Sequence, residues 1–243
     1  MQYWGITDLG CVRSQNQDVY QIEELDRNTV LYVVCDGMGG AKSGNVASTL
    51  AADVFTQEIR RSYKNDMAPE EIDQMLRSAV KLANFTVFDQ SQQFEEFSGM
   101  GTTLVAVLVQ GKQVTIVNVG DSRAYSITEK GVYQLTTDHS LVQMMIDKGE
   151  LTPEKAKTYP GKNLITRAIG TEIVVECDIF HHKAENDECL LLCSDGLSNL
   201  VDDQELLFEV VHGGEMESVC ERLLAIAKNR GAPDNVTCVL AQV

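Results

Sequence analysis

Short runs of apolar and β-branched residues, separated by turn-forming residues, recur along much of the chain. Each run has the length of a strand, and two pairs of runs are joined by only three residues that include glycine, which predicts β-hairpins. The hairpin turns are residues 110–112 and 129–131. Consecutive hairpins favour antiparallel sheets over a parallel, doubly wound sheet. The predicted strands are residues 29–35, 102–109, 113–119, 123–128, 132–135, 188–193 and 235–242.

Two other parts of the chain show helical periodicity, in which apolar residues return every three or four positions. The first contains a predicted helix at residues 44–61 and a second that begins at Pro69, where a proline followed by two glutamates is typical of a helix start. The later part predicts helices at 203–211 and 216–229. Pairs of helices separated by strands predict the α+β class, with antiparallel sheets covered by helices on their outer faces.

Residues 139–162 follow neither pattern. They contain a short helical stretch and then Gly149, Pro153 and Pro160, which is typical of an irregular surface excursion. Long excursions of this kind are often lids or binding loops, and they can equally be plain variable loops. From the residues alone both interpretations stay open.

The composition suits one compact domain over residues 1–243, because 44% of the residues are hydrophobic and no Pro-, Gly- and Ser-rich linker or internal repeat interrupts the chain. The formal net charge of −16 argues against binding to nucleic acids or to an anionic membrane surface, since both are themselves negative. The excess of carboxylates either keeps the protein in solution or gathers some of them around cations. Only the positions of the acidic residues along the chain can distinguish solubility from cation binding.

Cysteine usage and the chain ends bear on the compartment. The seven cysteines include no CxxC pair, which argues against a zinc ribbon and favours thiols in a reducing environment. The N-terminus has no basic segment followed by an apolar stretch, and no apolar run approaches membrane-spanning length. We therefore expect a soluble, cytoplasmic protein.

Aspartates stand at the ends of predicted strands or in nearby loops: Asp18, Asp36, Asp121, Asp195 and Asp234. Taken singly, each is an ordinary turn residue, because aspartate caps local backbone groups and the neighbouring glycines accept positive φ. Taken together, they would bring several carboxylates to one rim of the sheets, where they would repel one another without cations. Oxygen ligands unaccompanied by histidine or cysteine favour magnesium or manganese over zinc.

Such a site suits the hydrolysis of phosphate esters. Two metal ions held a few ångströms apart can lower the pKa of a water between them, so that it attacks phosphorus. The reaction also needs a cation for the phosphate oxygens, and Arg13 fits because guanidinium binds phosphate through two parallel hydrogen bonds. The alternative role for Arg13 is a surface ion pair with Asp18 on the same loop.

Short motifs follow one another along nearly the whole chain: Arg13-x-x-Asn16-Gln17-Asp18, Val34-Cys35-Asp36-Gly37-Met38-Gly39-Gly40, Gly101-Thr102-Thr103, Gly120-Asp121-Ser122-Arg123, Asp138-His139-Ser140, Thr166-Arg167-Ala168-Ile169-Gly170, Ser194-Asp195-Gly196-Leu197 and Asp234-Asn235-Val236-Thr237. Together they resemble the metal-dependent protein phosphatase 2C family in its compact bacterial form. One motif alone would be weak, whereas the full set in family order is specific. The resemblance implies a four-layer α-β-β-α sandwich of two antiparallel sheets flanked by helices, with a flap subdomain.

The resemblance also implies a metal centre with two to three divalent ions, manganese or magnesium, at one end of the sandwich. Asp36 resembles the carboxylate that bridges two metal ions, and Gly37 resembles the residue whose carbonyl binds one of them. Asp195 and Asp234 resemble the ligands of the other ion.

Further roles come from the same resemblance. Asp18 resembles the acidic residue that holds metal-bound water, and Arg13 resembles the phosphate-binding arginine. Asp121 resembles a residue that, in bacterial members, joins the position of Asp195 in holding a third metal ion. The excursion at 139–162 resembles the flap beside the active site.

One position departs from the family pattern. Some members have histidine where this chain has Met38, and that histidine is thought to act as a general acid. A thioether cannot donate a proton. Metal-bound water could supply the leaving-group proton instead; His139 is a candidate in principle, and a structural role in its loop is the alternative.

The function that the resemblance implies is a serine/threonine protein phosphatase that acts on phosphorylated proteins and opposes a bacterial Ser/Thr kinase. Because no apolar surface stripe is evident in the sequence, we expect a monomer. One alternative is a hydrolase of small phosphate esters or phosphotyrosine, because the metal site would activate water regardless of the ester. Another is a non-catalytic phosphoprotein-binding module on the same fold. Such a module would be expected to lack metal-binding aspartates, and this chain retains Asp36, Asp195 and Asp234.

Overall fold

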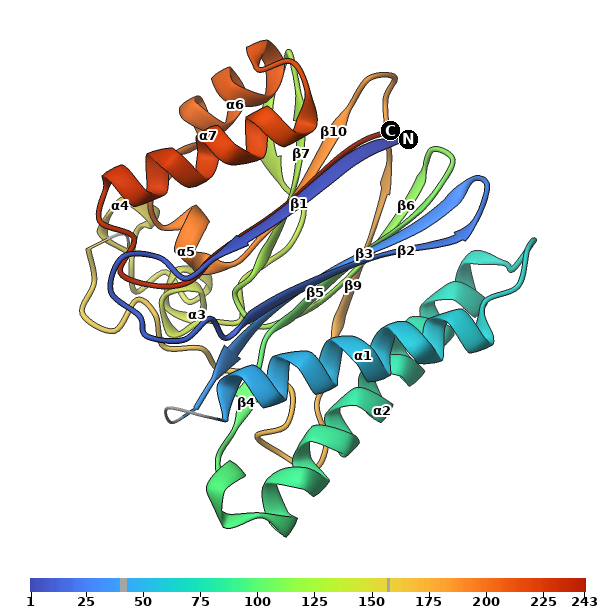
Figure 1. Ribbon diagram of the computed structural model, residues 1–243, viewed down its shortest axis with the longest axis vertical. Helices are drawn as coiled ribbons and strands as arrows, with labels where there is room; N and C mark the ends of the chain where they lie inside the picture. The colour runs from blue at the N-terminus through green and yellow to red at the C-terminus, as the bar shows by residue number, and fades with distance from the viewer. Residues whose placement is uncertain (40–42, 157) are drawn as a thin grey trace.

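Two antiparallel sheets face each other in the computed structural model, which describes residues 1–39, 43–156 and 158–243 (Figure 1). The first sheet has the strand order β1 (Gln2–Asp8), β11 (Val236–Gln242), β10 (Cys189–Cys193), β7 (Arg123–Thr128) and β8 (Gly131–Gln134). The second has the order β2 (Asp18–Asp26), β3 (Thr29–Met38), β5 (Leu104–Gln110), β6 (Gln113–Val119) and β9 (Asp178–Lys183). The short strand β4 (Gly101–Thr102) pairs with the end of β3.

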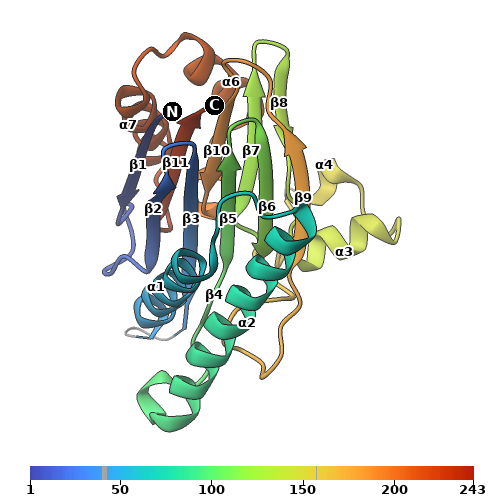
Figure 2. The ribbon, with the colours of Figure 1, turned by 90° about the vertical axis from the view of Figure 1, so that its right-hand side faces the viewer.

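Helices cover the outer face of each sheet (Figures 1 and 2). The long helices α1 (Gly44–Ser62) and α2 (Pro69–Gln93) pack on the second sheet, and α6 (Asp203–His212) and α7 (Met216–Asn229) pack on the first. The shorter helical segments are η1 (Glu95–Phe97), α3 (Leu141–Asp147), α4 (Pro153–Ala156) and α5 (Asp195–Ser198). The predicted α+β class with four α-β-β-α layers is thereby confirmed.

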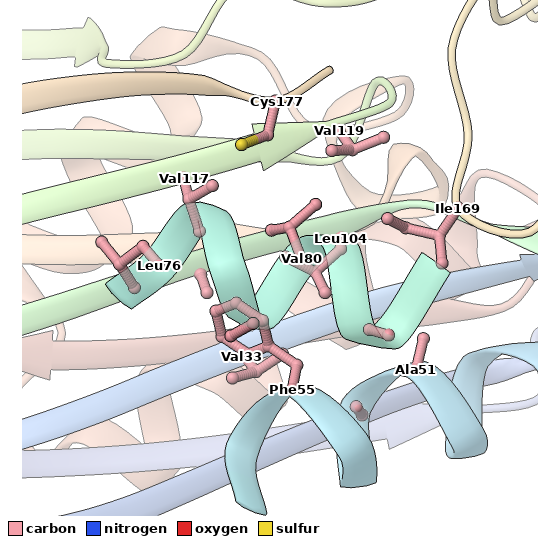
Figure 3. Packing of buried hydrophobic residues seen from close by; sticks show 14 of the residues in the cluster. Val33, Ala51, Phe55, Leu76, Val80, Leu104, Val117, Val119, Ile169 and Cys177 are labelled. Carbon is pink, nitrogen blue, oxygen red and sulfur yellow. The ribbon is translucent and has the colours of Figure 1, made fainter. Parts of the chain in front are cut away.

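Strand β3 shows why its sequence is apolar without alternation: both of its faces are buried. Val33 points toward α1 and α2, where it lies among Phe55, Leu76 and Val80 (Figure 3). Tyr32, on the opposite face, belongs to the cluster between the two sheets. Full burial of a large apolar side chain stabilises the fold by about 1.5–3 kcal/mol, so this strand anchors both core layers.

The predicted strands differ from the observed ones in two ways. Strands β1, β2 and β9 were not predicted, and all three lie at sheet edges. The predicted strand at 102–109 is divided between β4 and β5 at Thr103, where the chain leaves one pairing with β3 and begins the other.

The segment 139–162 forms α3 and α4 beside the sheets (Figure 2). Ser140, near the start of the segment, forms an isolated antiparallel bridge with Ile165, just beyond its end, and the backbone N–H of Leu141 donates to the carbonyl of Leu164 at 2.8 Å. This closure holds the segment next to the end of the sandwich where the predicted site residues gather.

The cysteines of the described residues are free thiols, and six of them are buried while Cys11 is exposed. Among these residues, none of the helices has both the length and the apolar character needed to cross a bilayer.

Candidate active site

A cavity of about 310 Å³ opens at one end of the sandwich, where strands of both sheets begin or end. Asp36 lies near the end of β3, and Asp121 follows β6. Asp195 follows β10, and Asp234 precedes β11. These four side chains line the cavity together with Arg13, Gln17, Gly37, Met38, Gly39, Thr103, Asn163 and Ile165. The topology therefore brings together aspartates that are far apart in the sequence.

Asp36 is held through its backbone. Its N–H donates to the Thr103 hydroxyl at 2.9 Å, and its carbonyl accepts from the Thr102 hydroxyl and the Thr103 N–H, both at 2.9 Å. Gly37 follows at a position where a Cβ would meet the carbonyl oxygen of Gly44 at 2.1 Å, so another residue would force the backbones apart. The glycine thus keeps the first turn of α1 close to the site.

Asp18 lies beneath the cavity rather than in its lining. It pairs with Asp36 across β2 and β3 and is only 5% exposed. Its Oδ2 accepts from the Ser194 hydroxyl at 2.7 Å, whereas its buried Oδ1 has no hydrogen-bond partner among the described residues. Burial raises the pKa of this carboxyl to about 6, and the charges of Asp195 and Asp234 act in the same direction.

The other carboxylates are perturbed in the same sense. Burial, followed by the charges of the neighbouring aspartates, raises the pKa of Asp36 well above its usual range. Burial and the charge of Asp195 raise the pKa of Asp121 to about 7, and burial with the charge of Asp234 raises that of Asp195. Several carboxylates crowded in a low-dielectric pocket cannot all ionise without a compensating positive charge.

Arg13 is the cation that lies among them. Its guanidinium donates to Asp234 Oδ2 at 2.7 Å, so the ion pair is with Asp234 and not with Asp18 as the sequence suggested. The Arg13 side chain is 50% exposed and can reach solvent at the cavity mouth. The loop that carries it is fastened by Asn235, whose Nδ2 donates to the carbonyls of Leu9 and Gln15 at 3.0 Å.

A scan of protein families matches residues 12–241 to the model described as protein phosphatase 2C. The chain is 35% identical over 236 residues to the serine/threonine phosphatase stp of Listeria welshimeri, covering 97% of this chain and 93% of that protein. It also resembles the crystal structure of serine/threonine phosphatase Stp1 from Staphylococcus aureus, with a TM-score of 0.93, 38% identity and coverage of 99% and 94% of the two chains. The chain belongs to the protein phosphatase 2C family. It is a phosphatase, and phosphatases of this family are metal-dependent.

A second solved structure agrees with this assignment. The Mycobacterium tuberculosis serine/threonine phosphatase PstP/Ppp gives a TM-score of 0.89 at 34% identity and covers 100% of this chain and 98% of that one. The family resemblance inferred from the motifs is therefore confirmed.

The donor set fits the divalent ions on which protein phosphatase 2C enzymes depend. Carboxylate oxygens dominate the cavity, which suits hard cations, and the unpartnered Asp18 Oδ1 lies beside them. Among the described residues, however, no three acidic, histidine or cysteine side chains surround a single point that could hold an ion. The carboxylates instead turn to protein neighbours: Asp234 to Arg13, and Asp195 to the Asn199 amide at 3.0 Å.

Some residues that shape or line the cavity have no catalytic group, and the sequence analysis assigned them no role. Thr103 bonds Ser122 at 2.7 Å, which ties the Asp36 turn to the residue after Asp121. Asn163 and Ile165, which lie just beyond the 139–162 excursion, line the cavity. The one sequence feature that could have indicated these two residues is their proximity to the motif at 166–170. Gly40, the last residue of another motif, lies outside the described residues.

Met38 lines the cavity where some protein phosphatase 2C enzymes have histidine. His139 is 7% exposed and is not among the lining residues, since its ring bonds the backbone of Gly120 and the carboxylate of Asp178. Of the two roles considered for His139, the contacts favour the structural one.

Proposed function

We propose that this protein is a serine/threonine protein phosphatase that hydrolyses phosphoserine and phosphothreonine esters with two to three divalent ions, manganese or magnesium. The observation that carries the proposal is the convergence of Asp36, Asp121, Asp195 and Asp234 on one cavity with Arg13 at its mouth. The names of the similar proteins, which are serine/threonine phosphatases, support the choice of substrate class.

Asp36, the Gly37 carbonyl, Asp195 and Asp234 would hold the two central ions. Asp121 would join Asp195 around a third, and Asp18 would hold the water in their coordination shells through its free Oδ1. Bound divalent cations supply activation of water and neutralisation of the phosphate charge.

The side chains around the cations divide the remaining tasks. Arg13 is placed to bind two phosphate oxygens, which requires it to exchange its ion pair with Asp234 for the substrate. The Asp234 carboxylate, which already lines the cavity, would then be free to bind an ion. Met38 contributes an apolar wall and no proton, so the leaving group would receive its proton from water rather than from this side chain.

The broader setting is proposed on the same basis. We expect one catalytic domain over the whole chain, acting as a monomer in the cytoplasm on proteins phosphorylated by a Ser/Thr kinase. The family match from residue 12 to residue 241 supports the single domain. Light scattering on the purified protein tests the monomer.

The decisive test is phosphate release from a phosphothreonine peptide with Mn²⁺ and then with excess chelator. We expect hydrolysis that chelation abolishes. Parallel reactions with a phosphotyrosine peptide and p-nitrophenyl phosphate separate a protein phosphatase from the broader hydrolase. Absence of release from a folded sample with either metal ion would contradict the proposal and favour a binding module.

Two amide substitutions test the ligand assignment. Asp36→Asn and Asp234→Asn each remove one carboxylate charge while keeping the side-chain shape, and we expect a loss of turnover of at least about 100-fold because the affected ion loses an anionic ligand. The matched control is Asp187→Asn, at an exposed turn beyond the other end of β10 with φ of 59°, which asparagine tolerates. Wild-type rates in either Asp36→Asn or Asp234→Asn would remove that residue from the site.

A further inference from the structure

Two motifs that the catalytic proposal does not use, 138–140 and 166–170, meet in the structure around one buried histidine. His139 is 7% exposed, and its Nε2 lies 3.2 Å from Asp178 Oδ2 and 3.0 Å from the Arg167 guanidinium. Arg167 also donates to Asp178 Oδ1 at 2.9 Å. The imidazole is therefore fixed on one side by a carboxylate that an arginine holds in place.

On its other side, His139 holds the residue before Asp121. The Gly120 N–H donates to His139 Nδ1 at 3.0 Å, and the His139 backbone N–H donates to the Gly120 carbonyl at 2.9 Å. Gly120 has φ of +109°, and a Cβ there would meet the Thr103 methyl at 2.6 Å, so the position requires glycine. Because glycine restrains its own backbone least, its neighbours must fix the direction in which Asp121 leaves β6.

These contacts define the tautomer of the ring. Nδ1 accepts a hydrogen from Gly120, so it carries no proton, and the neutral imidazole must be protonated at Nε2. Nε2–H then donates to Asp178. Arg167 is also a hydrogen-bond donor. Although its guanidinium lies 3.0 Å from Nε2, it donates to Asp178 Oδ1 and not to the ring. A carboxylate that fixes the tautomer of a histidine also fixes its orientation.

His139 also contacts a second segment next to residues that line the cavity. Its carbonyl accepts from the Thr166 N–H at 2.8 Å, and Ser140 pairs with Ile165 in the adjacent bridge. Ile165 and Asn163 line the same cavity as Asp121. His139 thus joins the chain after β6, which presents the Asp121 carboxylate, to the segment that carries Asn163 and Ile165.

We propose that His139 is a positioning residue that sets the place of the Asp121 carboxylate in the cavity through its bond to the Gly120 backbone. The inference rests on the proposed role of Asp121 as a metal ligand. It assigns no contact between His139 and substrate or metal, and it accounts for why Asp178 and Arg167 converge on a side chain outside the cavity.

Two substitutions separate the contact of Nδ1 with Gly120 from the contact of Nε2 with Asp178. In His139→Asn the amide oxygen can occupy the place of Nδ1 and accept from Gly120. In His139→Gln the amide reaches the place of Nε2 and can contact Asp178, but the Gly120 N–H loses its acceptor. Mn²⁺ binding to the full chain is measured from the electron paramagnetic resonance signal of the free ion, which needs no catalytic activity.

We expect His139→Gln to weaken one class of Mn²⁺ site by about 10–100-fold, the range seen when residues behind metal ligands are replaced. Asp121→Asn should weaken the same class, and His139→Asn should restore affinity to within about threefold of wild type. The proposal would be overturned if His139→Asn and His139→Gln lost Mn²⁺ affinity equally. It would also be overturned if His139→Gln weakened a different class of Mn²⁺ site from the one that Asp121→Asn weakens.

The tautomer is checked separately by long-range ¹H–¹⁵N spectra of the histidine rings, of which the chain has four. A proton on Nδ1 of His139 would refute the proposed contact even if His139→Gln failed to fold. If wild-type protein bound no Mn²⁺, the metal-site proposal would fail together with this inference. If wild type bound Mn²⁺ and His139→Gln did so equally well, only this inference would fail.

Discussion

At the level of individual residues, carboxylates and the Arg13 guanidinium set the chemistry of the cavity. Asp18, Asp36, Asp121 and Asp195 all have raised pKa values, with burial as the largest cause. Arg13 offsets part of this charge through its ion pair with Asp234 at the exposed rim, and the charges of Arg123 and Arg13 also oppose the rise in the pKa of Asp195. The cluster therefore costs stability unless cations enter, which is the expected trade between a stable and a functional site.

Replacing Arg13 tests its assignment to substrate. Arg13→Ala should raise KM for a phosphothreonine peptide by about tenfold, which corresponds to the loss of one charge-assisted contact, with a smaller effect on kcat. The reason is that Asp36 and its neighbours remain in place to hold cations. Arg27→Ala, an exposed arginine in the turn between β2 and β3, removes the same charge far from the cavity. Steady-state kinetics at saturating Mn²⁺ in which Arg13→Ala matched the Arg27 control would exclude Arg13 from the site.

The sequence singled out the four aspartates that line the cavity, together with Asp18, but not the contacts that hold them. Their signal was local, because each lies in a short motif beside a strand end. The contacts that position them join distant residues: Ser194 and Asp18, which share a hydrogen bond, are 176 positions apart. The alternative role considered for Arg13, an ion pair with Asp18, rested on the same local signal. Sequence proximity favoured it, whereas the fold brings Asp234 closer.

At the scale of elements, buried strands were easier to predict than edge strands. Strand β3 is buried on both faces and reads as a continuous apolar run. Strand β1 contains exposed and half-buried residues and none that is fully buried, and β9 includes His181, His182 and Lys183. Polar side chains on edge strands limit unwanted pairing with other chains, and the same polarity removes the apolar signal from which strands are predicted.

Helix α6 begins with a cap that can be tested on its own. Asp202 Oδ1 accepts from the backbone N–H groups of Gln204 and Glu205 at 3.0 Å, and the Glu205 carboxylate accepts from the Asp202 N–H at 3.2 Å. Asp202→Ala should lower the free energy of unfolding by about 1 kcal/mol, measured by urea denaturation. Asp203→Ala, one residue later and exposed, removes the same charge without the cap. Equal losses in the two variants would attribute the effect to charge rather than capping.

At the scale of the whole molecule, the apolar layers of the sandwich stabilise the fold, and the acidic end of the sandwich carries the residues of the candidate active site. The apolar clusters lie under the helices and between the sheets, whereas the carboxylates of the cavity gather at one end of these layers. Removal of a metal ion should therefore leave the core intact and change only the electrostatic free energy of that end. The formal net charge of −16 adds to the repulsion there.

The pH dependence of stability in chelator follows from the raised pKa values. Asp18 titrates at about 6 and Asp121 at about 7 in the folded, metal-free protein, whereas an unfolded aspartate titrates at about 3.9. A carboxyl whose folded pKa is raised favours the folded state below its unfolded pKa, and this contribution is lost as pH rises through the folded pKa. Stability without metal should thus decline between about pH 4 and pH 7 as these groups ionise inside the fold.

We expect the melting temperature in chelator to be lower at pH 8 than at pH 5.5 by on the order of 5 °C, which corresponds to ~2 kcal/mol for a chain of this size. Mn²⁺ should raise the melting temperature more at pH 8, because at pH 5.5 protons compete with the ion for the same carboxylates. Calorimetry at the two pH values, with and without Mn²⁺, measures both effects. Asp121→Asn removes one of the titrating groups and should flatten the profile in chelator. A profile that Asp121→Asn left unchanged, or an equal Mn²⁺ increment at the two pH values, would show that the stability change arises elsewhere than in the crowded carboxylates.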